Sequence, residues 1–295
     1  MISVVIPFFN ERENLKILIP KLLENLNGLK KEYEVILVDD GSVDGGVKDI
    51  LPEKKNIKLV YHRKKKGKGL ALSDGISCAK GETIIFMDAD LQDDPSDIKK
   101  FIKKIDEGYD FVNGKRIKRE DNFLVRTYSY LANFFLRKLL LSPYTDINCG
   151  FKAFKKEVLK DFVFYGNNFR FLPLAVFYEG FKVTEVEVAN YPRRYGVSKF
   201  GWTKFFAGFF DTLTAYFLYK FSEKPLHFFG TIGGIIFLFG SIINLFLTIE
   251  RLFFGVLLYR RPLLFAGILL VIVGVQILMT GILGELIVYR RKQND

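Results

Sequence analysis

The sequence predicts an α/β protein with a mostly parallel sheet, followed by two C-terminal transmembrane helices. Short β-branched, apolar runs alternate with helix-like segments in the N-terminal part of the chain. Acidic or glycine-rich clusters follow several of these runs, where a parallel sheet presents its loops. Two long segments after Pro225 contain no Asp, Glu, Lys or Arg. Together these patterns indicate a nucleotide-binding type of sheet joined to a membrane anchor.

Apolar runs over residues 2–8, 33–38, 57–61 and 83–87 are the predicted buried strands. Residues 14–29 carry apolar side chains at helical spacing and would connect the first two strands as a β-α-β unit. The same reasoning predicts further helices and one short strand. The helices are expected over 70–79, 96–107 and 124–141, and the strand over 111–113.

Residues 226–249 and 262–284 are the charge-free segments, and each is long enough to cross a hydrocarbon core of about 30 Å. Two buried core helices are the alternative, but the chain has too little remaining sequence to surround them. Residues 202–221 mix aromatic side chains with Lys204, Asp211 and Lys220, as expected of an interfacial amphipathic helix. We therefore expect a cytoplasmic domain over 1–200, an interfacial helix and linker over 201–224, and a two-helix anchor over 225–295.

Composition and charge indicate the surroundings of the chain. The formal net charge of +11 accompanies long apolar segments, so it fits an anionic membrane surface and phosphate-bearing substrates better than nucleic acid. Cys78 and Cys149 are far apart and form no CxxC pair, so neither a disulfide framework nor a zinc site is indicated. The N-terminus lacks a signal-peptide pattern, and basic residues at the C-terminus favour cytoplasmic placement of both ends of the anchor.

Asp88 and Asp90 stand one residue apart directly after an apolar strand, with Gln92 close behind. Oxygen ligands suit a hard divalent cation, and Mg²⁺ is usually held by one or two carboxylates plus substrate phosphates. A lone DxD is often only a solvated loop. Here it is accompanied by three other clusters at predicted strand or helix ends, which are PFFNE at 7–11, DDGSVD at 39–44 and GKGLAL at 67–72.

With MDADLQDDP at 87–95, DINCGFKAF at 146–154 and RRYGVSK at 193–199, these motifs resemble glycosyltransferase family 2 of the GT-A fold. The resemblance is to its polyprenyl-phosphate branch, which includes dolichol-phosphate mannose synthases and undecaprenyl-phosphate glucosyltransferases. It implies a Rossmann-like catalytic domain that moves a sugar from a UDP- or GDP-sugar to a polyprenyl phosphate. It also implies a requirement for Mg²⁺ or Mn²⁺ and contact with membrane lipids.

The resemblance assigns roles residue by residue. Asp90 and Gln92 would bind the metal, and Arg116, Arg126 and Ser129 the acceptor phosphate. Catalysis would fall to Asp88, Asp90, Arg116, Arg193 and Lys199. The donor would be bound by Pro7, Asn10, Glu11, Asp39, Asp40, Lys68, Asp88, Ala89, Arg193, Ser198 and Lys199.

Some of these assignments have alternatives. The match at Arg126 is shifted by a residue, so this side chain could instead contact lipid headgroups, with Arg119 as its substitute. Lys65 stands where relatives often have Asn, which could change base or sugar preference. The two histidines, His62 and His227, receive no role.

Two other functions compete with this one. A processive polysaccharide or glycolipid synthase would usually carry a Q-x-x-R-W segment, and the single tryptophan, Trp202, lies outside any such segment. A non-catalytic membrane scaffold predicts eroded metal ligands, whereas Asp88, Asp90 and Gln92 are intact. The two-span layout favours uridine over guanosine in the donor; the sugar, the polyprenyl chain and homo-oligomerisation stay open.

Overall fold

The structure is a computed structural model of the full chain. It describes residues 1–45, 47, 51, 55–117, 142–160, 162–164, 166–192, 213–214, 216–257 and 261–294. The chain forms two compact units, Met1–Ala215 and Tyr216–Asp295. The helix predicted over 124–141 and most of the interfacial helix predicted over 202–221 lie outside the described residues.

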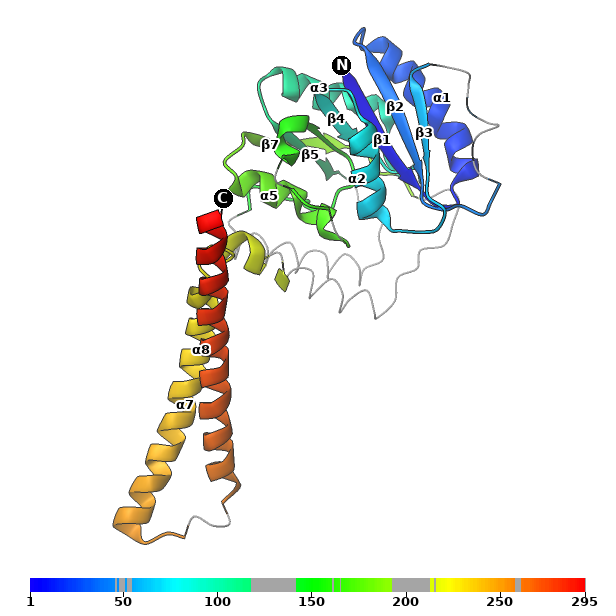
Figure 1. Ribbon diagram of the computed structural model, residues 1–295. Coiled ribbons are helices and arrows are strands. Elements are labelled where there is room, and N and C mark those ends of the chain that lie inside the picture. Colours follow the sequence, from blue (N-terminus) through cyan, green and yellow to red (C-terminus); the bar gives the residue numbers. More distant parts are fainter. Residues whose placement is uncertain are drawn as a thin grey trace. The chain divides into compact units, whose positions relative to one another are not determined.

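The first unit is built on a seven-stranded sheet with the strand order β3-β2-β1-β4-β6-β5-β7 (Figure 1). Its strands are β1 (Ile2–Phe8), β2 (Tyr33–Asp39), β3 (Ile57–Tyr61), β4 (Thr83–Phe86), β5 (Phe111–Arg116), β6 (Lys152–Lys155) and β7 (Val183–Val188). Neighbouring strands are parallel except where β6 pairs with β4 and with β5. The predicted α/β class and mostly parallel sheet are confirmed.

Helices cover both faces of this sheet, which explains why the central strands are continuous apolar runs. The helices are α1 (Arg12–Gly28), α2 (Lys68–Cys78), α3 (Ile98–Asp106) and α5 (Leu172–Tyr178), with short 3-10 turns η2 (Pro95–Asp97), η3 (Lys156–Leu159) and η4 (Asn168–Phe171). Val4 and Ile6 of β1 join the core formed with α1 and α3. Val5 faces α2, where a Cβ on Gly75 would lie 2.5 Å from its Cγ1.

β6 and β7 were not predicted, and β5 is longer than the expected strand at 111–113. β6 has four residues and begins with a lysine, so neither its length nor its composition resembles a buried strand. It forms because it can pair on both sides, with β4 and with β5. Tertiary pairing here overrides a weak local preference.

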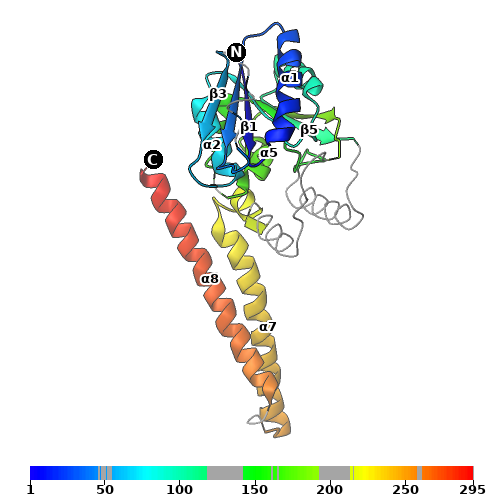
Figure 2. The ribbon, with the colours of Figure 1, turned by 90° about the vertical axis from the view of Figure 1, so that its right-hand side faces the viewer.

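The second unit is a hairpin of two long helices, α7 (Pro225–Phe254) and α8 (Pro262–Asn294). They lie side by side in both views (Figure 1, Figure 2). Their most apolar windows have mean hydropathies of 2.3 and 2.6, yet only 17% and 11% of these windows are buried. Such exposure is opposite to that of core helices, and the two helices are long and apolar enough to cross a membrane.

Glycines set the close approach of α7 to α8. A Cβ on Gly233 would lie 2.8 Å from the carbonyl oxygen of Gly274, and one on Gly240 would lie 2.8 Å from that of Gly267. The adjacent Gly234, in contrast, has open space around it. The seam between the helices therefore uses small residues where the two backbones meet.

Candidate active site

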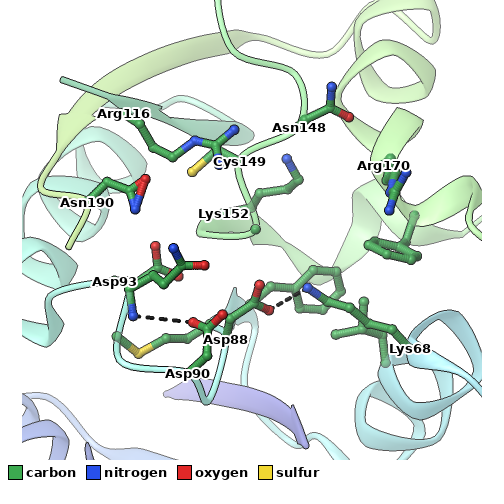
Figure 3. Close-up of a pocket in the computed structure, with 16 residues that line it drawn as sticks. Lys68, Asp88, Asp90, Asp93, Arg116, Asn148, Cys149, Lys152, Arg170 and Asn190 are labelled. Atoms are coloured by element: carbon green, nitrogen blue, oxygen red, sulfur yellow. Dashed lines mark hydrogen bonds and ion pairs between the residues drawn. The ribbon is translucent and has the colours of Figure 1, made fainter. Parts of the chain in front are cut away.

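The acidic loop that follows β4 forms one wall of a cavity of about 270 Å³. Leu91 adopts a positive φ of 61°, and the Asp90 carboxylate accepts a hydrogen bond of 3.3 Å from the Gln92 amide. The resulting turn brings together the carboxylates of Asp88, Asp90 and Asp93, which all line the cavity (Figure 3). Asp90 and Asp93 are buried. The loop thus concentrates negative charge at the carboxyl end of β4.

Four cationic side chains line the same cavity. They come from separate elements and are Lys68, Arg116, Lys152 and Arg170. Figure 3 shows Arg116 and Arg170 across the cavity from the acidic loop. The cavity therefore has an acidic wall, formed by Asp88, Asp90 and Asp93, and a basic wall, which includes Arg116 and Arg170. Such an arrangement can hold anionic groups and a cation together.

Burial, followed by the negative charges of Asp88 and Asp90, raises the pKa of Asp93 to about 7. Burial is the larger cause, and the like charges of Asp88 and Asp90 add a repulsion to it. A divalent cation would relieve that repulsion, and the ligands on offer are oxygens, which suit Mg²⁺ or Mn²⁺. No group of three or more His, Cys, Asp or Glu among the described residues is arranged to hold a metal alone. The residues thus fit a cation whose coordination is completed by phosphate oxygens.

Lys68 begins α2, directly after Gly67, whose φ of 99° favours glycine. Its ammonium group contacts the Asp88 carboxylate and lies 5.2 Å from the centroid of the Phe169 ring. A Cβ on Gly150 would lie 2.7 Å from Oδ2 of the same aspartate, so this glycine lets the chain pass close to the carboxylate. The position of Asp88 is therefore fixed from two sides.

Arg116 lies at the end of β5 and pairs with the buried Asp146. Its Nε donates to Oδ2 at 2.7 Å and its Nη2 donates to Oδ1 at 3.0 Å. This bidentate geometry fixes the plane of the guanidinium group. Next to it, burial raises the pKa of the Cys149 thiol to about 12, so that wall residue stays a neutral thiol.

The loop that precedes α2 is anchored on Asp40. Its carboxylate accepts hydrogen bonds from the main-chain amides of Lys66 and Gly67, at 2.7 and 2.9 Å. The imidazole of His62 lies 2.8 Å from Asp40 on one side and 2.8 Å from Asp74 on the other. Asp40 and His62 thus shape the loop that delivers Lys68. Sequence analysis gave His62 no part in the site chemistry, and its contacts here are structural ones to Asp40 and Asp74.

The other predicted donor residues lie at the ends of β1 and β2 and tie them together. Asn10 accepts a hydrogen bond of 2.8 Å from the Val43 amide, and Asp39 accepts one of 2.7 Å from the Ser42 amide. The described cavity lining contains Lys68, Asp88, Asp90, Gln92 and Arg116 of the predicted residues. It does not contain Pro7, Asn10, Glu11, Asp39 or Asp40, and the side chain of Ala89 packs in the core instead.

Five predicted site residues lie outside the described residues. They are Arg126, Ser129, Arg193, Ser198 and Lys199. Sequence reasoning assigned no role to six polar residues that line the cavity, namely Asp93, Asn148, Cys149, Lys152, Arg170 and Asn190. Asp93 could have been found as the next carboxylate of its acidic run, and three others belong to the stretch at 146–154. Arg170 and Asn190 stand in no motif that would have indicated them.

Comparison with known proteins places this site in a family. Residues 3–163 match the model of glycosyl transferase family 2. The chain is 30% identical over 302 residues to a dodecaprenyl-phosphate galacturonate synthase of Rhizobium johnstonii, covering 100% of this chain and 89% of the relative. It is 31% identical over 293 residues to an undecaprenyl-phosphate 4-deoxy-4-formamido-L-arabinose transferase of Proteus mirabilis, covering 97% and 88%.

A solved structure has the same fold. It is glucosyl-3-phosphoglycerate synthase from Mycobacterium tuberculosis in complex with Mn²⁺, UDP and glucosyl-3-phosphoglycerate. The TM-score is 0.58 at 19% identity, covering 74% of this chain and 79% of that one. On the family match and the two relatives, the chain belongs to glycosyl transferase family 2.

Proposed function

We propose that the chain transfers a sugar from a nucleotide sugar to a polyprenyl phosphate and releases the nucleoside diphosphate. The observation that carries this proposal is the cavity with one acidic and one basic wall (Figure 3). A donor diphosphate needs a cation held by carboxylates, whereas an acceptor phosphate needs cationic side chains. Both needs are met in one cavity of a chain whose second unit is a long apolar hairpin.

The relatives support the acceptor, since both are named for transfer to dodecaprenyl or undecaprenyl phosphate. The solved neighbour holds UDP and Mn²⁺, which supports a uridine donor and a divalent cation. The relatives' names specify galacturonate and 4-deoxy-4-formamido-L-arabinose. Acidic and amino-modified sugars therefore belong among the donors to be tested.

When bound, a Mg²⁺ or Mn²⁺ ion would supply Lewis acidity and charge compensation for the departing diphosphate. Asp90 and Gln92 would hold that ion, and Asp88, fixed by Lys68, would orient the donor. A phosphate oxygen of the acceptor is already ionised at neutral pH, so no side chain has to remove a proton. Arg116 would align this oxygen with the anomeric carbon for a single displacement with inversion.

The remaining roles follow the resemblance. Arg126 and Ser129 would add to the acceptor site. Arg193, Ser198 and Lys199 would contact the donor diphosphate. Residues 1–200 would form a cytoplasmic catalytic domain, 201–224 an interfacial segment and 225–295 an anchor in the cytoplasmic membrane with both ends cytoplasmic.

The test is transfer of radiolabelled sugar into solvent-extractable lipid by purified protein. Polyprenyl phosphate is supplied with a panel of UDP- and GDP-linked hexoses, uronic acids and pentoses, with Mg²⁺ or Mn²⁺ and with or without EDTA. We expect metal-dependent label in a lipid from which mild acid releases the sugar. Label in a growing polysaccharide would favour a processive synthase. An absence of label with every donor would contradict the proposal.

A further inference from the structure

A row of three polar side chains crosses the sheet from β6 through β5 to β7. The strand register places Lys152 beside Asn113, and Asn113 beside Glu185. Lys152 Nζ donates to Asn113 Oδ1 at 2.7 Å, and Asn113 Nδ2 donates to Glu185 Oε1 at 3.3 Å. Lys152 and Asn113 are only 2% and 0% exposed. We call these three residues the polar row.

The polar row holds the backbone of residues 145–147. Glu185 accepts from the amide of Thr145 at 2.9 Å, from its hydroxyl at 2.6 Å, and from the amide of Asp146 at 3.1 Å. Asn113 Nδ2 donates to the carbonyl oxygen of Asp146 at 2.8 Å. Lys152 Nζ donates to the carbonyl oxygen of Ile147 at 3.1 Å. Hydrogen bonds from three different strands therefore converge on one short segment.

Asp146, the central residue of this segment, is connected to the cavity through Arg116. Asp146 is the carboxylate that binds Arg116 in the bidentate pair, and Arg116 lines the cavity. An acceptor phosphate needs the guanidinium in one orientation, because a fork of donors binds two oxygens only when it is in plane with them. A displacement of about 1 Å at such a group can cost about 10²-fold in rate.

The composition of the polar row also needs an explanation. Burial lowers the pKa of Lys152 to about 8, so a buried ammonium group is retained at a cost. Apolar residues at these three sheet positions would pack without that cost. The hydrogen bonds of Lys152 to described residues go to Asn113 and to the segment beside Asp146. Because the hydrogen bonds of the polar row converge on residues 145–147, the row is best explained by a need to hold this segment in one position.

We infer that Glu185, Asn113 and Lys152 are positioning residues for the acceptor: they fix residues 145–147 so that Asp146 aims the Arg116 guanidinium at the acceptor phosphate. The inference rests on the proposed function, in which Arg116 binds that phosphate. Glu185 is the informative member because it does not line the described cavity. It acts on the cavity only through the residues that it contacts, which include the 145–147 segment and Asn113 of the polar row.

The chain offers a matched control on the same strand. Glu187 lies two residues after Glu185, and its carboxylate is 3.5 Å from Lys115, its partner in the β5–β7 register. Its side chain is 64% exposed. Glu185→Gln and Glu187→Gln are therefore the same chemical change at successive positions on one sheet face, and only the first touches residues 145–147. Thr145→Val is a milder second variant, since it removes the single hydrogen bond from the Thr145 hydroxyl.

The experiment measures the KM for polyprenyl phosphate and for the donor, together with direct binding of farnesyl phosphate in the presence of UDP and Mn²⁺. For Glu185→Gln we expect the acceptor KM and the farnesyl phosphate Kd to rise about tenfold, with the donor KM unchanged. Thr145→Val should shift both values in the same direction by about threefold, and Glu187→Gln should leave them unchanged. In an Arg116→Gln background, Glu185→Gln should have little further effect, because both variants remove the same contact.

Folded Glu185→Gln and Thr145→Val variants with wild-type acceptor values would overturn the inference. An equal rise in the KM values for donor and acceptor would also overturn it. So would a full further rise in the acceptor KM when Glu185→Gln is added to Arg116→Gln, since each result indicates a general structural role. If the wild-type chain binds farnesyl phosphate but transfers no sugar, the proposed reaction fails while the binding comparison still decides the inference. If the wild-type chain neither binds nor transfers, both fail.

Discussion

Nδ1 of His62 lies 2.8 Å from Oδ1 of Asp40, and the two side chains are only 2% and 6% exposed. The Asp40 carboxylate also accepts hydrogen bonds from the main-chain amides of Lys66 and Gly67, in the loop that precedes α2. The loop that leads into α2 is thus attached to the end of β2 through one buried carboxylate and its histidine partner.

We expect His62→Leu to loosen this loop. The variant leaves Asp40 buried with one partner fewer, which should lower the free energy of unfolding by about 1–3 kcal/mol. The donor KM should rise, because Lys68 follows the loop directly. Thermal unfolding and donor titration measure the two effects. Lys64→Leu, the same replacement at an exposed position of the loop, should change neither.

Asp90→Ala should abolish turnover while leaving the protein folded. The variant removes a carboxylate from the wall that would hold the divalent cation. Turnover, metal titration and circular dichroism test this together. Asp94→Ala is the control, since Asp94 lies outside the described cavity lining and caps the amide of Ser96 at 2.9 Å. That control should cost about 1 kcal/mol of stability and retain activity. Full metal-dependent activity of Asp90→Ala would refute the role of Asp90.

Gly150→Ala should impair catalysis through Asp88. The added Cβ would meet Oδ2 of Asp88 at 2.7 Å, so the carboxylate has to shift from the position in which it contacts Lys68. We expect a drop in kcat of about tenfold or more. Gly28→Ala, at the end of α1 where a Cβ meets nothing within 4 Å, should keep wild-type kinetics. Unchanged kcat in a folded Gly150→Ala variant would contradict the placement of Asp88.

The buried ammonium group of Lys152 predicts a pH dependence of stability. Because burial lowers its pKa from 10.5 to about 8, the unfolded chain binds the proton more tightly than the folded chain. The resulting penalty is fully present below pH 8 and is relieved as pH rises from about 8 toward 10.5. The Tm of the wild-type protein relative to Lys152→Met should therefore increase over this range. A constant difference would show that Lys152 titrates normally.

Gly233→Val should disrupt the hairpin of α7 and α8, whereas Gly234→Val should not. At Gly233 the new side chain meets the backbone of α8, but at Gly234 it meets open space. Overpacking of this kind costs about 1–3 kcal/mol. Thermal stability in detergent, with cross-linking between cysteines introduced on the two helices, distinguishes the variants. Equal behaviour of both would argue against the glycine seam.

The sequence predicts the parallel half of the sheet well because β1 to β4 are apolar runs followed by acidic or glycine-rich loops. Periodicity likewise indicates α1, and the length of the two charge-free segments indicates α7 and α8. It cannot reveal β6, whose first residue, Lys152, is charged and becomes buried only through contacts with β5 and the 145–147 segment. His62 was overlooked for a similar reason, because its two carboxylate partners are 22 and 12 residues away in the chain.

The reversed direction of β6 has a consequence for how such an enzyme can diversify. Because β6 runs antiparallel to β4 and β5, the segment leading into it arrives at the same sheet edge as the loop leaving β4. The acidic loop after β4 and the 145–147 segment that carries Asp146 are thus encoded by separate stretches of sequence that meet only in the folded protein. Substitutions in one stretch can then leave the other unchanged, so that, under the proposed function, donor binding and acceptor binding are free to change separately on one scaffold.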